Sequence, residues 1–228
     1  MTVLSILIPT LVERQAQLAR LESKLRAQIV RANLHGQVDL EILCDNREQT
    51  LGEKRNRLIA QARGEFIAFV DDDDDVCENY VTLVYRALQE HPNVDCLGIT
   101  GLVYFRGIHP HRFIYSLQYN HYFSKDGVYY RPPYTLNPVR REIVRQFPFA
   151  QINYNEDIDW AIRVANARAL RHEFMIDQTL YYYYCRTHWL YQWGVDITEP
   201  IRHPLGLQFV NRLRVAQWIN SHLKGIFR

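Results

Sequence analysis

The segment GEKRNRLIAQARGEFIAFVDDDDD, residues 52–75, contains the pattern on which the fold assignment rests. Its first part has the apolar spacing of a helix and stops at Gly64, and EFIAFV, residues 65–70, is a short apolar run typical of a buried strand. Five aspartates, residues 71–75, follow that strand directly. This order predicts one unit of a parallel α/β sheet with a charged site at the carboxyl end of a strand.

The sequence before this segment continues the alternation of strand and helix. VLSILIP, residues 3–9, and VDLEILC, residues 38–44, have the pattern of strands, and a helix is expected between them from about residue 13 to 33. Strand, helix, strand, helix and strand in succession predict a doubly wound sheet. The leucines and isoleucine expected on the buried face of the first helix are Leu18, Leu21, Leu25 and Ile29.

The sequence after the aspartates has a more mixed pattern. A helix at about 78–91 is followed by a strand at 94–105, and an Asp126-Gly127 turn predicts a β-hairpin within 119–130. The remaining expected elements are a helix from Pro138 to about 147, a helix at 156–170, a strand at 179–185 and a basic helix at about 205–227.

Composition and charge limit the class of protein. The 228 residues are 47% hydrophobic and 23% charged, which excludes a disordered or fibrous chain. No apolar stretch approaches the roughly 20 residues of a spanning helix, and no signal-peptide pattern follows Met1, so we expect a cytoplasmic protein without stable membrane insertion. The four cysteines are widely spaced without a CxxC pair, which suggests neither a zinc site nor a disulfide framework.

The five adjacent aspartates are the strongest indication of a site. Like charges at this spacing repel one another unless a cation or hydrogen-bond donors compensate them, and hard oxygen ligands favour Mg²⁺ or Mn²⁺. The alternative is a solvated acidic loop, or a set of helix caps formed by Asp74 and Asp75. The position directly after a buried strand favours the metal site.

Three segments together resemble family 2 glycosyltransferases of the GT-A fold, of the small stand-alone type. They are LSILIPT at residues 4–10, the segment 52–75 quoted above, and NEDIDWAIR at residues 155–163. The resemblance implies a doubly wound mixed sheet in which a Rossmann-like nucleotide-binding half is fused to an acceptor-binding half. It also implies inverting, metal-dependent transfer of a hexosyl or pentosyl group from a nucleotide diphosphate sugar, with a UDP-sugar favoured, to a hydroxyl acceptor.

The expected organisation is a single GT-A domain over residues 1–228. The nucleotide-sugar half covers about residues 1–100, the acceptor half about 101–190, and a helical tail about 191–228.

The resemblance implies a donor pocket at the strand ends. Pro9 and Thr10 would cradle the nucleotide, and Asp45 would accept a hydrogen bond from the base. Arg55 matches the arginine of the family's Arg-Asn pair, and a cation near a helix N-terminus suits a diphosphate. Without the resemblance, Lys54, Arg55 and Arg57 would be interpreted as part of a solvated helix face.

The resemblance also implies roles within the acidic run. Asp71 would approach the ribose, Asp73 would hold the Mn²⁺ or Mg²⁺ that bridges the diphosphate, and Asp72 and Asp74 are alternatives in a register shifted by one residue. His188 matches a histidine that serves as an additional metal ligand or closes over the diphosphate; the alternative is a packing residue.

The third matching segment would supply the catalytic carboxylate. In the family the second residue of a Glu-Asp motif is the general base, which implies Asp157 as the base and Glu156 as the residue that positions the acceptor. Asp159 is expected to be structural. On local grounds alone, acidic residues at a helix start are commonly caps.

The stretch Tyr104–Arg145 is basic, with seven Lys and Arg against Asp126 and Glu142, and it is rich in tyrosine. In the family this region forms the acceptor side. It suggests an anionic acceptor, either a nucleic acid with a hydroxylated base or a phospholipid-linked or phosphate-bearing glycan. In the alternative account the arginines serve the donor phosphates or solvent and the tyrosines fill the core.

Two other functions are compatible with the sequence. A sugar nucleotidyltransferase shares the doubly wound half and the metal-binding acids, but its glycine-rich loop is missing after the first strand, where Leu11 to Arg14 stand. A non-catalytic module that binds nucleic acid or a membrane surface would explain the basic middle and the basic C-terminal helix. The acidic run together with Glu156 and Asp157 argues against it.

Overall fold

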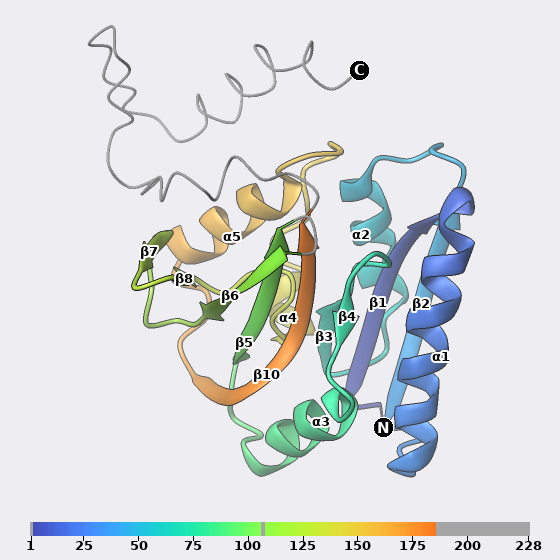
Figure 1. The fold of residues 1–228 in the computed structure, drawn as a ribbon, viewed down its shortest axis with the longest axis horizontal. Coiled ribbons are helices and arrows are strands. Elements are labelled where there is room, and N and C mark those ends of the chain that lie inside the picture. Colours follow the sequence, from blue (N-terminus) through green and yellow to red (C-terminus); the bar gives the residue numbers. More distant parts are fainter. Residues whose placement is uncertain (1, 106–107, 186–228) are drawn as a thin grey trace, which may run out of the picture.

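The first strand is buried on both of its faces, which divides the molecule into layers. A computed structural model describes residues 2–105 and 108–185, in which one ten-stranded sheet has helices on both faces (Figure 1). The elements up to residue 90 are β1 (Leu4–Leu11), the 3₁₀ turn η1 (Val12–Arg14), α1 (Gln15–Arg31), β2 (Val38–Asp45), α2 (Leu51–Gln61), β3 (Phe66–Phe69), β4 (Asp75–Val76) and α3 (Tyr80–Glu90). The elements after residue 90 are β5 (Cys96–Phe105), β6 (Ile108–Tyr115), β7 (Phe123–Lys125), β8 (Val128–Arg131), β9 (Val139–Arg140), α4 (Arg141–Val144), α5 (Glu156–Asn166) and β10 (Glu173–Cys185).

The sheet is mixed, as expected. Its order is β2-β1-β3-β9-β5-β6-β8-β7, and β10 pairs with both β5 and the short β4. Strand β1 runs parallel to β2 and β3, whereas β9 is antiparallel to β3 and joins the two halves of the sheet. The parallel first half places the carboxyl ends of β1, β2 and β3 at one edge.

The two faces of β1 pack into different cores. Leu4, Ile6 and Ile8 are fully buried in the core that α1 and α3 cover. Leu7 points to the other face and packs with residues of α2, α4 and α5, among them Trp160. Burying each of these side chains contributes roughly 1.5–3 kcal/mol. The sheet therefore holds α2 and α5 on the same side, which brings the start of both helices to one edge.

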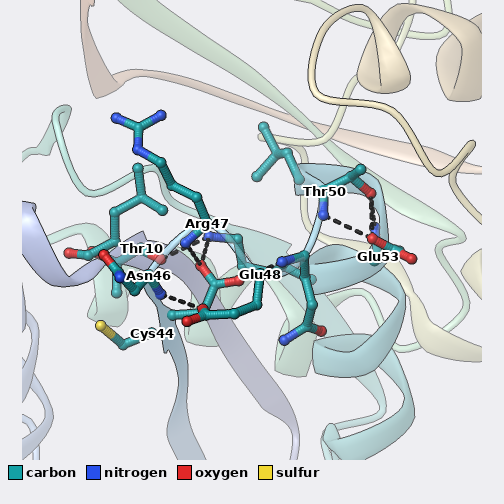
Figure 2. Close-up of polar contacts among 12 residues, drawn as sticks. Thr10, Cys44, Asn46, Arg47, Glu48, Thr50 and Glu53 are labelled. Atoms are coloured by element: carbon teal, nitrogen blue, oxygen red, sulfur yellow. Dashed lines mark hydrogen bonds and ion pairs between the residues drawn. The ribbon is translucent and has the colours of Figure 1, made fainter.

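Helix α2 begins with a capping box. Thr50 Oγ1 accepts a hydrogen bond from Glu53 N at 3.2 Å, and Glu53 Oε2 accepts one from Thr50 N at 2.7 Å (Figure 2). Such a cap contributes about 1 kcal/mol to helix stability. The turn that leads into it contains Arg47 at φ 68°, and Asn46 N donates to Glu48 Oε2 within the same turn (Figure 2). These contacts fix the start of α2 relative to β2.

The prediction of a helix from Pro138 to residue 147 was wrong in its first part. Val139 and Arg140 form strand β9, because Val139 pairs with both Ile67 of β3 and Cys96 of β5 and completes the sheet between them. Only the four residues of α4 are helical. Strands β4 and β6 were also missed, and the helix expected to reach residue 170 ends at Asn166.

Other predicted elements are confirmed with shifted ends. The hairpin forms between β7 and β8, and Asp126 and Gly127 adopt φ values of 51° and 76°, as a two-residue turn of this kind requires. The helix expected at 205–227 lies outside the described residues. Within residues 2–105 and 108–185, no helix combines the length and apolar character needed to cross a bilayer.

Candidate active site

The five aspartates after β3 point in different directions, and two of them face away from the strand ends. Asp75 pairs with Arg20 Nη1 at 3.0 Å and Lys24 Nζ at 3.1 Å, both from α1. Asp74 is buried, and its carboxylate accepts hydrogen bonds from Tyr181 Oη at 2.8 Å and from Tyr184 N at 2.9 Å. Burial and the charge of Asp71 raise the pKa of Asp74 well above its usual value. These two residues anchor the run to α1 and β10.

Tyr181 connects the buried Asp74 to the first residue of the acidic run, Asp71. Its hydroxyl also accepts a hydrogen bond from Asp71 N at 3.2 Å, so one fully buried side chain holds both ends of the turn that carries Asp72 and Asp73. Sequence reasoning missed this residue. The only signal was its place in the strand TLYYYYC, residues 179–185, where four adjacent tyrosines conceal which one points inward.

Asp72 is buried between the first strand and the first helix. Thr10 Oγ1 donates to its Oδ2 at 2.5 Å, and Arg14 Nη1 donates to its Oδ1 at 2.8 Å. The Asp72 side chain is 1% exposed, whereas that of Asp73 is 27% exposed and lies 3.3 Å from the same Arg14 Nη1. Asp72 is thus already compensated, and Asp73 presents its carboxylate at the surface.

Asp71 belongs to a group of three charges that joins the two halves of the chain. Arg55 Nη2 donates to Asp71 Oδ1 at 3.1 Å, and Arg55 Nε donates to Glu156 Oε1 at 3.2 Å. The guanidinium is 1% exposed and lies over the Phe69 ring, with Cζ 4.7 Å from the ring centroid. Burial alone would lower the pKa of Arg55, but Asp71, Glu156 and Asp157 together raise it. Arg55 therefore stays charged.

The carboxylates of this group are destabilised by their surroundings. Burial and the neighbouring charge of Asp157 raise the pKa of Glu156 to about 7, against the opposing effect of Arg55. Burial also raises the pKa of Asp71, and the charges of Asp73, Asp157 and Asp72 add to it. Asp71, Glu156 and Asp157 surround the single cation Arg55, so a further cation would be stabilised beside them.

Glu156 and Asp157 differ in exposure although they are adjacent at the start of α5. The Glu156 side chain is 2% exposed and faces Arg55, so it holds the arginine instead of presenting a carboxylate at the surface. Asp157 is partly exposed and accepts a hydrogen bond from Ile158 N at 2.7 Å. In the described part of the chain no cation is paired directly with Asp157. Asp159 pairs with Arg163 at 2.8 Å within the helix.

The segment before α5 is fastened to α2 by four hydrogen bonds that the sequence did not reveal. Gly52 N donates to Ile152 O at 3.1 Å, and Leu51 N donates to Asn153 Oδ1 at 3.0 Å. Asn56 exchanges two bonds with the backbone of Phe149, at 2.9 and 2.8 Å. Arg55 and Asn56 thus both act on the segment that ends in Glu156. The Arg-Asn pair had pointed to this helix, but only toward a donor contact for Arg55.

The predicted nucleotide-binding residues at the other strand ends also meet at this edge. Asp45 is paired with Lys54 Nζ at 2.6 Å and accepts a hydrogen bond from Gln49 N at 2.9 Å. Although burial opposes the effect, the Lys54 bond and the backbone amides lower the pKa of Asp45. Lys54 Nζ also donates to Thr10 O at 2.9 Å, which ties the carboxyl end of β1 to α2. Pro9 is buried within β1.

The residues fit a divalent cation whose ligands come partly from the protein and partly from a bound phosphate. Within residues 2–105 and 108–185, no cluster of three or more acidic, histidine or cysteine side chains is arranged to hold a metal by itself. Asp71 and Asp73 nevertheless supply hard carboxylate oxygens beside an excess of negative charge. Mg²⁺ is commonly held in this way, by one or two carboxylates together with substrate phosphates and water. His188, the other predicted metal ligand, lies outside the described residues.

The model of Glycosyl transferase family 2 matches residues 27–173, which is more than half of the chain. This match includes the acidic run and the helix start that carries Glu156 and Asp157. No curated protein matches the sequence.

Solved structures of S. aureus TarS have a similar fold. The structure of its residues 1–349 in complex with UDP-GlcNAc has a TM-score of 0.53 and 15% identity, and covers 82% of this chain and 60% of that one. The corresponding complex with UDP has a TM-score of 0.53 and 17% identity, and covers 81% and 61%. The chain therefore spans about three fifths of the length of these structures. At this level of identity the likeness establishes the GT-A fold.

Proposed function

The chain belongs to glycosyl transferase family 2, and on that basis we propose that it transfers a sugar from a nucleotide diphosphate sugar to a hydroxyl acceptor with inversion. The observation that carries the proposal is that Asp73 and Asp157 both lie near Asp71, which the buried Arg55 holds at the end of β3. A UDP-sugar is the favoured donor, because two of the similar structures are complexes with UDP-GlcNAc and UDP.

The proposed cofactor is Mn²⁺ or Mg²⁺. Asp73 would hold the cation, Asp71 lies beside it on the same turn, and His188 is a further proposed ligand. When bound, such a cation neutralises charge on the departing diphosphate. Asp72 is the weaker candidate for a metal ligand, because Thr10 and Arg14 already occupy its carboxylate.

Asp157 is the proposed general base. It is the more exposed residue of the Glu-Asp pair, and a base must reach the proton that it removes. Removing the proton as the acceptor hydroxyl attacks the anomeric carbon would contribute roughly 10²- to 10⁴-fold to the rate. A single displacement of this kind inverts the anomeric configuration.

Glu156 and Arg55 have a positioning role in this proposal. Arg55 joins Glu156 at the start of α5 to Asp71 at the end of β3, and so sets the distance between the proposed base and the proposed metal site. Rigid spacing matters because catalysis depends on near-attack geometry, in which a displacement of about 1 Å costs on the order of 100-fold. Glu156 would act on the acceptor through Asp157 and not by direct contact.

The donor nucleotide is proposed to lie across the ends of β1 and β2. Pro9 and Thr10 form the end of β1 there, and Asp45 ends β2. Both Asp45 oxygens already accept hydrogen bonds, so a base would share an acceptor with Lys54 or the backbone amide of Gln49. Arg55 would act on the donor indirectly, by holding the Asp71 carboxylate in place.

The acceptor side is proposed to include the aromatic hairpin β7–β8. Tyr119, Phe123 and Tyr130 form a partly exposed cluster, in which the Phe123 and Tyr130 rings stack at 4.8 Å. Other tyrosines of the same stretch fill the core, as Tyr115 does at 2% exposure. Partly exposed rings next to basic residues suit a hydroxyl acceptor that carries negative charge, such as a phosphate-bearing glycan, a phospholipid-linked glycan or a nucleic acid.

Donor hydrolysis and transfer test the proposal directly. Nucleotide release from UDP-, GDP- and dTDP-sugars would be measured with Mn²⁺ or Mg²⁺ for the wild type, Asp73→Ala and Asp157→Asn. We expect metal-dependent release from one donor, loss of metal dependence in Asp73→Ala, and loss of turnover with donor binding retained in Asp157→Asn. Asp159→Asn is the control, because it removes a carboxylate from the same helix turn without touching the site. The absence of both release and metal-dependent nucleotide binding in the wild type would refute the proposal.

A further inference from the structure

Arg14 pairs with two aspartates of the acidic run, and one of them is Asp73, the proposed metal ligand. Arg14 ends the short turn η1, between the carboxyl end of β1 and the first residue of α1. Its Nη1 lies 2.8 Å from Asp72 Oδ1 and 3.3 Å from Asp73 Oδ2, so a single nitrogen bridges both carboxylates. Partial burial opposes the charged form, but the bond to Asp72 and the charges of Asp72, Asp73 and Asp71 raise the pKa of Arg14. The run therefore has an internal counter-ion.

The two contacts of Arg14 are unequal. Asp72 is 1% exposed and is also held by Thr10, so the shorter contact is anchored in the core. Asp73 is 27% exposed and the contact is longer, so it is the one that an entering cation would replace. Both contacts use Nη1. In the described residues Nε and Nη2 donate to no protein acceptor, and the side chain is 32% exposed, so this pair of donors is available to an anion.

From this geometry we infer that Arg14 couples the binding of the divalent cation to the binding of the nucleotide diphosphate. Without nucleotide, Arg14 shares Asp73 and competes with the cation. When a diphosphate is present, Arg14 stays anchored on Asp72, gives up Asp73 and donates to a phosphate oxygen through Nε and Nη2. The inference rests on the proposed function, since it assumes that the site takes a nucleotide diphosphate and a metal.

The consequence is measurable as a coupling between two ligands. The cation alone should bind weakly. The diphosphate should raise the affinity for the cation, because it draws the competing guanidinium away from Asp73. By linkage, the cation must strengthen diphosphate binding by the same factor. Removal of the guanidinium should therefore strengthen the binding of the cation alone and weaken the binding of the diphosphate. The coupling factor between the two ligands should fall.

The test uses Mn²⁺ and UDP as probes with the full chain. Mn²⁺ affinity would be measured by electron paramagnetic resonance of the unbound ion, with and without UDP, for the wild type and Arg14→Met. We expect Arg14→Met to bind Mn²⁺ alone about tenfold more tightly and to lose about tenfold in the coupling factor. The matched control is Arg20→Met, which removes the same charge from α1. Among the described residues, Arg20 donates hydrogen bonds to Asp75 and to the Asp74 carbonyl, and to neither Asp72 nor Asp73.

Arg14→Lys separates the guanidinium fork from the charge and guards against misfolding of Arg14→Met. A lysine keeps the positive charge near Asp73 but lacks the paired donors, so Mn²⁺ alone should bind as in the wild type while UDP with Mn²⁺ binds more weakly. The inference is overturned if wild type binds Mn²⁺ with UDP while Arg14→Met matches Arg20→Met, or if Arg14→Lys binds UDP with Mn²⁺ as the wild type does. Wild type that binds neither probe refutes the proposed function as well.

Discussion

Glu156 is a buried carboxylate whose charge is opposed by its surroundings. Its side chain is 2% exposed, and Arg55 is the one cation within reach in the described residues. Breaking a buried pair leaves a charge uncompensated and is costly, whereas the pair itself contributes little to stability. The group is therefore better explained by the position it gives to Asp157 and Asp71 than by the stability of the fold.

The raised pKa of Glu156 predicts a specific pH dependence of stability. A glutamate ionises near 4.5 when unfolded and near 7 in this site, so between these values the folded chain binds one more proton and its unfolding free energy falls as the pH rises. Glu156→Gln removes this titration. The stability of the variant relative to wild type should therefore rise across that window, by up to about 3 kcal/mol, and be constant outside it.

Urea unfolding at a series of pH values on both sides of this window measures the difference. Asp159→Asn is the control, because its partner Arg163 lies on the same partly exposed helix surface, and its relative stability should not follow the window of Glu156. A Glu156→Gln difference that stays constant from pH 4.5 to 7 would show that Glu156 ionises normally in the folded chain.

Tyr181 predicts a second effect that depends on a single hydroxyl. Tyr181→Phe removes the donor to Asp74 and the acceptor for Asp71 N, and leaves a buried carboxylate oxygen with one bond fewer. We expect a loss of about 1–3 kcal/mol in the free energy of unfolding and weaker binding of UDP with Mn²⁺. The reason is that the turn that carries Asp73 loses the two hydrogen bonds that hold its ends.

Tyr184→Phe is the matched control for the loss of the Tyr181 hydroxyl. Tyr184 contacts Asp74 through its backbone N–H, and its side chain is 40% exposed, so loss of its hydroxyl should change neither quantity. Chemical denaturation and nucleotide titration measure both variants. Equal effects in the two variants would mean that the Tyr181 hydroxyl does not organise the acidic run.

At the scale of elements, α2 holds the segment before α5 so closely that only glycine fits at residue 52. A Cβ on Gly52 would lie 1.8 Å from Ala150 O, a backbone atom that cannot move alone. Gly52→Ala should raise helix propensity by about 1 kcal/mol, yet it must push residues 150–153 away from α2. Because that segment leads directly into Glu156 and Asp157, the shift should lower kcat/KM by on the order of 100-fold.

Gly98→Ala controls for the general effect of an added methyl group. Its Cβ would meet side-chain atoms of Met175 and Glu173 instead of backbone, in β5 and β10 away from the proposed catalytic groups. Steady-state kinetics and thermal unfolding of both variants separate catalysis from stability. Equal losses of activity in the two variants would contradict a specific role for the contact between α2 and residue 150.

The longer elements could be predicted because their periodicity is set by their own residues. Helix α1 needs only its leucine spacing, and β1 and β3 are apolar on both faces. The two-residue strands β4 and β9 could not be predicted, because each exists only through its neighbours: Val76 pairs with Tyr181, and Val139 with Ile67 and Cys96. A strand of two residues has no period of its own.

At the scale of the molecule, the site is assembled from contacts that are distant in sequence. Arg55 and Glu156 are separated by 101 residues, and Tyr181 and Asp74 by 107. The sequence could identify the acidic residues, because carboxylates after a buried strand or at a helix start are visible locally. It could not predict which aspartates are exposed and which are buried, because Thr10, Arg14 and Tyr181 bind particular aspartates from other elements.

A site assembled in this way should link ligand binding to global stability. A ligand that binds only the folded state at about 100 times its Kd adds about 2.7 kcal/mol, which corresponds to roughly 5–10 °C in Tm for a chain of this size. UDP with Mn²⁺ should produce such a shift, and UDP with a chelator a much smaller one. Asp73→Ala should lose the metal-dependent part, whereas Asp159→Asn should keep it. Thermal scans at several UDP concentrations decide between these outcomes, and an equal shift with and without Mn²⁺ would mean that the nucleotide binds independently of the acidic run.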